Sequence, residues 1–277
     1  MTSNQPTENA ALATRSFRRE SFSLHYLEGG DRANPTLLLC HGLGAGKEQF
    51  TDDAAFFIQQ GFHVLVPDLR GHGQSKTPSH FTETSFSLVA YANDILELAD
   101  ELGIEKLHFV GNSLGGLVGL TILRLRPRLV ETFATFGTTY SLKTSSFTMG
   151  LAKFVNQLIP PSWVGDLGAK AVSRNAHGQA VMKKLLEAAN PKVTSLTMSH
   201  IAEYDLISVA GNSPKPMLLL RAEHDKQINA AIGPTIKELS VNANFKVVEV
   251  PGAAHCANLD APDLIREELL THFASAS

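Results

Sequence analysis

The chain has 277 residues, enough for one large α/β domain or two small ones. Its composition, 43% hydrophobic and 18% charged, is that of a globular protein and excludes a disordered one. The formal net charge of -3 comes without a basic stripe, so we expect no nucleic-acid partner.

The N-terminal residues 1–20 form a polar tail without the apolar segment of a signal peptide. No stretch reaches the roughly 18 apolar residues that a membrane span needs, so we expect a cytoplasmic protein. Cys40 and Cys256 have neither metal-ligand nor disulfide spacing, which fits a reducing compartment and predicts no metal site there.

Short apolar runs alternate with helical periodicity along the first half of the chain. Strands are predicted at 23–28, 36–40, 63–67 and 106–111. Helices are predicted at 47–60, 86–102 and 114–125. Buried strands that alternate with amphipathic helices indicate an α/β fold, with a mostly parallel sheet covered by helices on both faces.

The alternation stops between residues 138 and 213, where the pattern is helical without strands. Helices are predicted there at 147–159, 178–190 and 193–207, punctuated by prolines. After Pro216 a strand at 217–222, a helix near 230–240, a strand at 245–250 and a closing helix near 259–274 follow. We therefore predict an α/β core of residues 21–137 and 214–277, with 138–213 inserted as a helical cap, or lid.

The segment "VGNSLGGLVG" (110–119) places a G-x-S-x-G pattern between a predicted strand and a predicted helix. This is the context of a nucleophile elbow, a turn so tight that side chains two residues before and after the serine would obstruct it. Gly111 and Gly115 meet that demand on either side of Ser113, with Asn112 and Leu114 as its direct neighbours. The helix start also supplies a free backbone N–H beside the hydroxyl.

Three further segments complete a candidate site. A loop of His41, Gly42 and Leu43 follows the strand at 36–40, and we expect His41 to brace that loop by hydrogen bonding. The N–H groups of Leu43 and Leu114 are the candidate oxyanion donors. Beyond the cap, one acid and one histidine each follow a late strand, namely Asp225 and His255.

The chain order Ser113, Asp225, His255 resembles that of the α/β-hydrolase fold superfamily, and the resemblance extends from about residue 20 to 275. It is supported further by "VPDLRGHGQS" (66–75). The resemblance implies an eight-stranded-type sheet with a helical cap inserted before the late strands. It also implies a serine nucleophile, a histidine base and an orienting aspartate, without metal or organic cofactor.

A serine at the elbow argues against the haloalkane dehalogenases and epoxide hydrolases of this fold, which use aspartate there. We expect hydrolysis of a carboxylic ester, lactone or thioester of a small-to-medium apolar molecule. "GNSLGG" is also similar to the elbow of carbon–carbon bond hydrolases of vinylogous diketones, but Cys256 stands where those enzymes typically have tryptophan. A small-molecule receptor or signalling protein on the same fold is the third alternative.

Aromatic and methionine side chains of the cap are the weaker candidates for the substrate pocket. The candidates are Phe147, Phe154, Trp163 and Met198. The sequence is compatible with either a monomer or a homodimer, with a small-molecule substrate as the expected partner.

Overall fold

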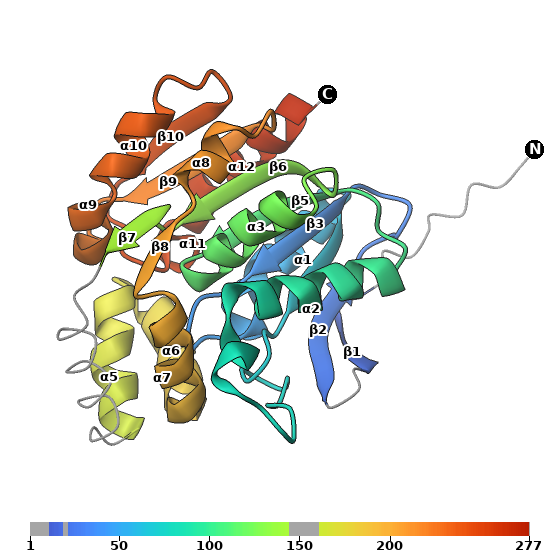
Figure 1. Ribbon diagram of the computed structural model, residues 1–277, viewed down its shortest axis with the longest axis vertical. Coiled ribbons are helices and arrows are strands. Elements are labelled where there is room, and N and C mark those ends of the chain that lie inside the picture. Colours follow the sequence, from blue (N-terminus) through green and yellow to red (C-terminus); the bar gives the residue numbers. More distant parts are fainter. Residues whose placement is uncertain (1–10, 19–21, 144–160, 277) are drawn as a thin grey trace, which may run out of the picture.

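The computed structural model describes residues 11–18, 22–143 and 161–276, and it is drawn as a ribbon in Figure 1. Its centre is an eight-stranded sheet in the order β1-β2-β4-β3-β5-β6-β9-β10. β2 pairs antiparallel with both β1 and β4, and the other neighbours are parallel. The strands are β1 (Ala13–Arg18), β2 (Ser23–Gly29), β3 (Thr36–Cys40), β4 (His63–Pro67), β5 (Leu107–Asn112), β6 (Val130–Phe136), β9 (Met217–Ala222) and β10 (Phe245–Val250).

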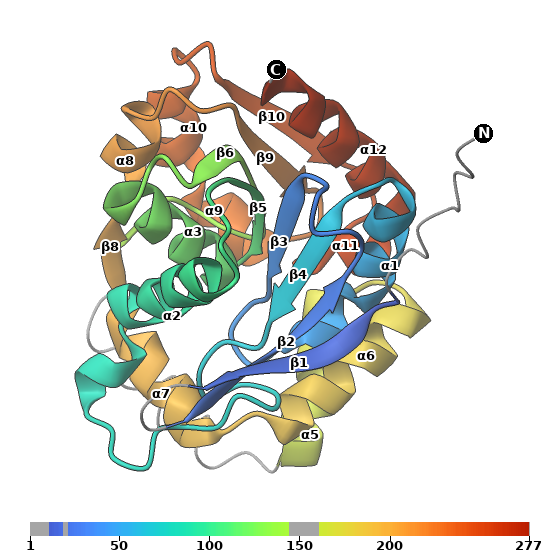
Figure 2. The same cartoon turned by 90° about the vertical axis from the view of Figure 1, so that its right-hand side faces the viewer.

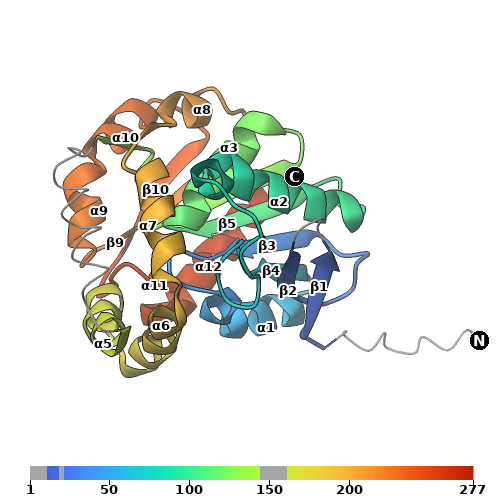
Figure 3. The same ribbon diagram turned by 60° about the horizontal axis from the view of Figure 1, so that its bottom comes forward.

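Helices cover both faces of this sheet, as Figures 2 and 3 show. On one face lie α2 (Leu88–Glu101) and α3 (Leu114–Leu125), and on the other lie α1 (Thr51–Gln59) and α12 (Pro262–Phe273). Alternate residues of β3 join the two cores, because successive side chains of a strand point to opposite faces. Leu38 packs with the α2 and α3 side, whereas Leu37 and Leu39 pack with the α1 and α12 side. The fold is therefore the α/β class that the alternating pattern predicted.

The inserted segment between β6 and β9 holds helices and one short ribbon. The helices are α5 (Pro161–Val172), α6 (Ala176–Ala188), α7 (Pro191–His200) and α8 (Ile207–Gly211). Figures 1 and 3 show α5, α6 and α7 gathered at one end of the molecule. The prediction of a segment without strands is wrong, because β7 (Ser141–Lys143) pairs antiparallel with β8 (Glu203–Asp205).

Other boundaries differ from the sequence prediction. The predicted tail of residues 1–20 contains a strand, β1, which pairs with β2 at the edge of the sheet. The helix predicted at 230–240 is two helices, α9 (Lys226–Ala231) and α10 (Gly233–Leu239). The closing helix is preceded by a separate short helix, α11 (Ala257–Asp260).

The helix predicted at 147–159, with Phe147 and Phe154, lies outside the described residues. None of the helices in the described ranges combines the length and the apolar character that a membrane crossing requires.

Candidate active site

Ser113 lies in the turn between β5 and α3, and its backbone is strained. Its φ of 52° makes it the single non-glycine residue with positive φ in the described part of the chain. Such a conformation costs about 1–3 kcal/mol and persists only where the surroundings enforce it. A Cβ on Gly111 would lie 2.4 Å from the nitrogen of Gly116, and one on Gly115 would lie 2.1 Å from the oxygen of Cys40. The two glycines therefore allow the close approach that the elbow needs.

The direction of the Leu114 N–H is set by the carbonyl of Ser113, because both belong to one planar peptide unit. Ser113 O accepts hydrogen bonds from Gly116 N at 3.0 Å, Leu117 N at 3.3 Å and Thr138 Oγ1 at 3.1 Å. In a trans peptide the N–H points opposite to the C=O. The Leu114 N–H therefore points away from this cluster of donors, at the free N-terminal end of α3.

The direction of the Leu43 N–H is set in the same way by the carbonyl of Gly42. That oxygen accepts from Nδ1 of His41 at 2.8 Å and from Ala45 N at 3.2 Å. His41 Nε2 accepts the N–H of Leu69 at 3.0 Å, so the ring proton must be on Nδ1. Burial lowers the pKa of His41, which keeps the ring neutral and this tautomer in place. His41 is thus hydrogen-bonded to the carbonyl of Gly42 and to the N–H of Leu69.

The loop of Gly42 lies directly on the elbow. A Cβ on Gly42 would be 3.3 Å from Cβ of Ser113 and 3.0 Å from Oδ1 of Asn112. The two candidate N–H donors, from Leu43 and Leu114, therefore belong to segments in contact beside the serine.

Asp225 and His255 form a hydrogen-bonded pair, although 30 residues separate them. Oδ2 of Asp225 accepts from Nδ1 of His255 at 2.7 Å. Oδ1 accepts from Ile228 N at 3.3 Å, because Asp225 also caps the N-terminus of α9. The carboxylate is buried, while 22% of the His255 side chain is exposed. With Nδ1 donating to the carboxylate, Nε2 is the ring nitrogen available to accept a proton.

Hydrogen bonds to backbone carbonyls hold His255 next to the elbow. Nδ2 of Asn112 donates to the carbonyl oxygens of His255 at 3.0 Å and Phe136 at 3.2 Å, and Ser113 N donates to Phe136 O at 3.0 Å. A Cβ on Gly137 would lie 3.0 Å from Cε1 of the His255 ring. No hydrogen bond joins the side chains of Ser113 and His255 in the described structure, and the two residues are linked through Asn112 and Phe136.

A cavity of about 370 Å³ opens at Ser113. Its lining is largely apolar and comes from the elbow, the end of β6, β7, α7, β8 and α9: Ser113, Leu114, Leu117, Gly137, Thr138, Thr139, Leu142, Met198, Ile201, Tyr204, Gln227, Ile228 and Ala231. Met198, one of the four cap residues predicted as weaker candidates for the substrate pocket, lies in this lining. Trp163 is not among the residues that line this cavity, and its side chain on α5 is 64% exposed.

Several lining residues were not predicted from the sequence. Tyr204 lies on β8 and donates its hydroxyl to the carbonyl of Thr139 at 3.2 Å, and neither residue carries a recognisable motif. Thr138 could have been suspected, because it follows a strand end beside Gly137. The lining residues on β7 and β8 could not have been suspected, because neither of these short strands was predicted.

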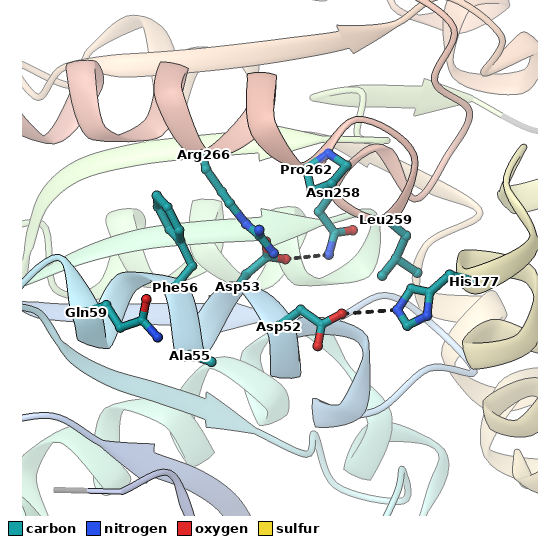
Figure 4. Close-up of a pocket in the computed structure, with 10 residues that line it drawn as sticks. All are labelled: Asp52, Asp53, Ala55, Phe56, Gln59, His177, Asn258, Leu259, Pro262 and Arg266. Atoms are coloured by element: carbon teal, nitrogen blue, oxygen red, sulfur yellow. Dashed lines mark hydrogen bonds and ion pairs between the residues drawn. The ribbon is translucent and has the colours of Figure 1, made fainter. Parts of the chain in front are cut away.

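A second cavity, of about 400 Å³, lies between α1, α6 and the α11–α12 segment (Figure 4). Nε2 of His177 and Oδ2 of Asp52 meet across it at 3.1 Å, but both side chains are well exposed. None of the predicted site residues lines this cavity. In the described residues, no group of three or more histidine, cysteine or acidic side chains is arranged to hold a metal ion.

Proteins of known sequence and structure resemble this chain over most of its length. The family model described as alpha/beta hydrolase fold matches residues 35–192. A protein of Pseudomonas syringae pv. syringae (strain B728a), named putative carbamate hydrolase RutD, is 30% identical over 245 residues, which cover 82% of this chain and 89% of that protein. Haloalkane dehalogenase 2 of Mycobacterium bovis (strain ATCC BAA-935 / AF2122/97) is 27% identical over 278 residues, covering 90% and 91%.

The fold itself is shared with solved structures of low sequence identity. The crystal structure of a hydrolase from Pseudomonas aeruginosa PA01 superimposes with a TM-score of 0.81 at 21% identity, covering 95% of this chain and 98% of the other. This likeness concerns the arrangement of helices and strands.

Proposed function

This chain belongs to the alpha/beta hydrolase fold family and is a hydrolase, and on that premise we propose that it cleaves a carboxylic ester with Ser113 as nucleophile. The observation that carries the proposal is the 2.7 Å hydrogen bond from His255 to Asp225, at the same edge of the sheet where β5 leads into the strained Ser113. A histidine oriented by a buried carboxylate beside a serine is the arrangement that activates a hydroxyl.

The reaction begins with attack of Ser113 Oγ on the ester carbonyl carbon while His255 Nε2 takes the hydroxyl proton. Asp225 holds the ring in the Nδ1–H tautomer and stabilises the imidazolium. The oxyanion of the tetrahedral intermediate is bound by the N–H groups of Leu43 and Leu114, and losing one such donor costs roughly 2.7–4 kcal/mol.

His255 then returns the proton to the leaving alcohol, which departs and leaves an acyl group on Ser113. A water molecule that gives its proton to the same nitrogen attacks the acyl carbon, and the acid is released as the serine regains its proton. No step of this route needs a metal ion or an organic cofactor.

The cavity supports a small-to-medium, mostly apolar substrate. Its volume of about 370 Å³ falls near the lower end of ligand pockets, which run from roughly 300 to 1,000 Å³. Met198 and Ile201 of the inserted segment line it together with elbow residues, which supports the proposal that residues 138–213 act as a cap.

A carbamate is the second candidate substrate, because the relative from Pseudomonas syringae is named a putative carbamate hydrolase. A carbamate presents the same kind of carbonyl carbon to the serine, with nitrogen in place of one carbon neighbour. The carbon–carbon hydrolase alternative is less favoured, since Cys256 is buried where those enzymes have tryptophan.

The test is an activity screen of p-nitrophenyl esters of increasing acyl length, an aryl carbamate and a ring-fission diketone, with Ser113→Ala as the control. We expect turnover of short or medium esters that the variant loses, and a fluorophosphonate adduct on Ser113 found by mass spectrometry. Equal inertness of wild type and variant, without an adduct, would contradict the proposal. Ligand-dependent partner binding that survives Ser113→Ala would indicate the receptor alternative instead.

A further inference from the structure

Gln49 is a buried side chain that joins three segments of the proposed site. It lies in the short 3₁₀ helix Lys47–Phe50 and is 1% exposed. Its Nε2 donates to Oδ1 of Asn112 at 3.0 Å and to Oδ1 of Asn258 at 3.3 Å, while its Oε1 faces the N–H of Gly42 at a long 3.5 Å. One amide thus connects the elbow, the helix that follows His255 and the oxyanion loop.

The partners of Gln49 leave it one possible orientation. Asn112 uses its Nδ2 on the carbonyls of His255 and Phe136, so its Oδ1 must face Gln49. Asn258 uses its Nδ2 on the carbonyl of Gln49 at 3.1 Å and on Oδ2 of Asp53 at 2.8 Å, so its Oδ1 also faces Gln49. Two acceptors converge on one position, and an NH₂ group satisfies both.

The outer end of this network is anchored where Figure 4 shows Asn258 and Arg266 meeting at Asp53. Nε of Arg266 donates to Oδ1 of Asp53 at 2.8 Å, and its guanidinium lies 5.1 Å from the centre of the Phe56 ring. Asp53 is buried on α1, and Arg266 belongs to α12. The network therefore ends on α1 and α12, two helices that pack against the sheet, and these helices hold the network in place.

We propose that Gln49 is a positioning residue for the hydrolysis, which sets the spacing between the oxyanion loop, the nucleophile elbow and the loop of His255. The proposal rests on the function proposed above and adds to it a residue that touches neither substrate nor the reacting atoms. Gln49 acts through Asn112, whose amide supports the carbonyl of His255, and through Gly42, which precedes the donor Leu43.

The chemistry is sensitive to this spacing. The Leu43 N–H and the serine oxygen come from separate strands, and a displacement of 1 Å at a reacting centre reduces rate by on the order of 100-fold. A fully satisfied polar network gives one arrangement of the three segments, whereas an unsatisfied one permits several.

Two substitutions at Gln49 test the proposal. Gln49→Met keeps the length of the side chain and removes both hydrogen-bonding groups. Gln49→Glu keeps the shape but places a carboxylate against the Oδ1 atoms of Asn112 and Asn258, and Asn112 cannot turn without losing two carbonyl partners. We expect kcat for the best ester to fall on the order of 10–100-fold in Gln49→Met, with KM within about 3-fold, and further in Gln49→Glu.

A trifluoromethyl ketone matching that ester provides a readout that stability alone would not change, because it binds as a tetrahedral adduct in the oxyanion site. Its affinity should fall in parallel with kcat. The matched control is Thr132→Val, which breaks a buried 2.9 Å hydrogen bond with His108 at the opposite end of β5 and β6. This variant should lose stability and keep wild-type kcat and inhibitor affinity.

Fluorophosphonate labelling separates failure of this inference from failure of the proposed function. Absence of a wild-type adduct on Ser113 would refute the proposed function and this inference with it. A wild-type adduct together with unchanged labelling rate, kcat and inhibitor affinity in both Gln49 variants would overturn the role of Gln49 alone. If these variants do not fold, Asn258→Ala replaces them, because it removes one of the two acceptors of the Gln49 Nε2 group. A reduced labelling rate in Asn258→Ala supports the proposal, and a wild-type labelling rate overturns it.

Discussion

Gly137 offers a measurement of how closely the histidine loop is packed against the elbow. Its φ of +61° lies in the left-handed region, and an added Cβ would meet Nδ2 of Asn112 at 2.7 Å, O of His255 at 2.9 Å and Cε1 of His255 at 3.0 Å. Gly103 has a similar φ of +67°, but its added Cβ would have no neighbour within 4 Å. An alanine at either position would therefore suffer the same backbone strain, but only the alanine at position 137 would also clash with its neighbours.

Gly103→Ala should cost about 1–2 kcal/mol of unfolding free energy, which is the left-handed penalty of an alanine. Gly137→Ala carries the same penalty plus the overpacking of a tight site, typically about 1–3 kcal/mol, so the total should be about 2–5 kcal/mol. Ester turnover should fall in Gly137→Ala, because the methyl group displaces the His255 ring, and should be unchanged in Gly103→Ala.

Urea unfolding of both variants and of the wild type gives the stability difference, and steady-state hydrolysis gives kcat. Equal destabilisation of the two variants, with wild-type kcat in Gly137→Ala, would refute the close packing of Gly137 against His255.

The remaining predictions concern buried titratable groups. Burial lowers the pKa of His72 to about 3, so between pH 6.5 and 3 the unfolded chain binds a proton that the folded chain does not. Unfolding free energy should therefore fall on acidification, with His72 contributing up to about 1.4 kcal/mol per pH unit, and denaturant titrations from pH 7 to 4 should show a shallower slope in His72→Gln. Lys47 and Asp68 form a 2.8 Å ion pair with side chains 3% and 0% exposed, so Lys47→Met should cost about 3–5 kcal/mol by leaving the carboxylate unpaired. A loss below 1 kcal/mol in thermal or urea unfolding would show that the Asp68 backbone donors suffice.

The strands β3, β4 and β5 and the elbow could be predicted because their signals are local. β3, β4 and β5 are buried on both faces, so each reads as a continuous apolar run of the kind that only a covered parallel sheet requires. The strained turn at Ser113 requires glycines at fixed positions near it, so it can be recognised from a short motif of consecutive residues. The family confirmed by comparison is the one that the order of these motifs indicated.

Four strands were not predicted, namely β1, β6, β7 and β8, and three of these depend on pairing for their existence. β1 is an edge strand whose residues are mostly exposed, so it carries little apolar signal, and only its pairing with β2 makes it a strand. β7 and β8 are three residues each, and their paired residues lie 60 to 64 positions apart in the chain. A strand of three residues forms only because its partner strand is present, and the local sequence pattern does not reveal that partner.

The same division runs through the candidate site. Residue types and chain order predicted Ser113, Asp225 and His255, because a serine nucleophile of this fold is followed along the chain by an acid and then a histidine. Only the tertiary structure decided that His255 meets Asp225 at 2.7 Å, and that Gln49 and Asn258 lie beneath the elbow. A buried amide is recognisable by the partners it satisfies, and folding brings those partners together from positions 63 and 209 residues away.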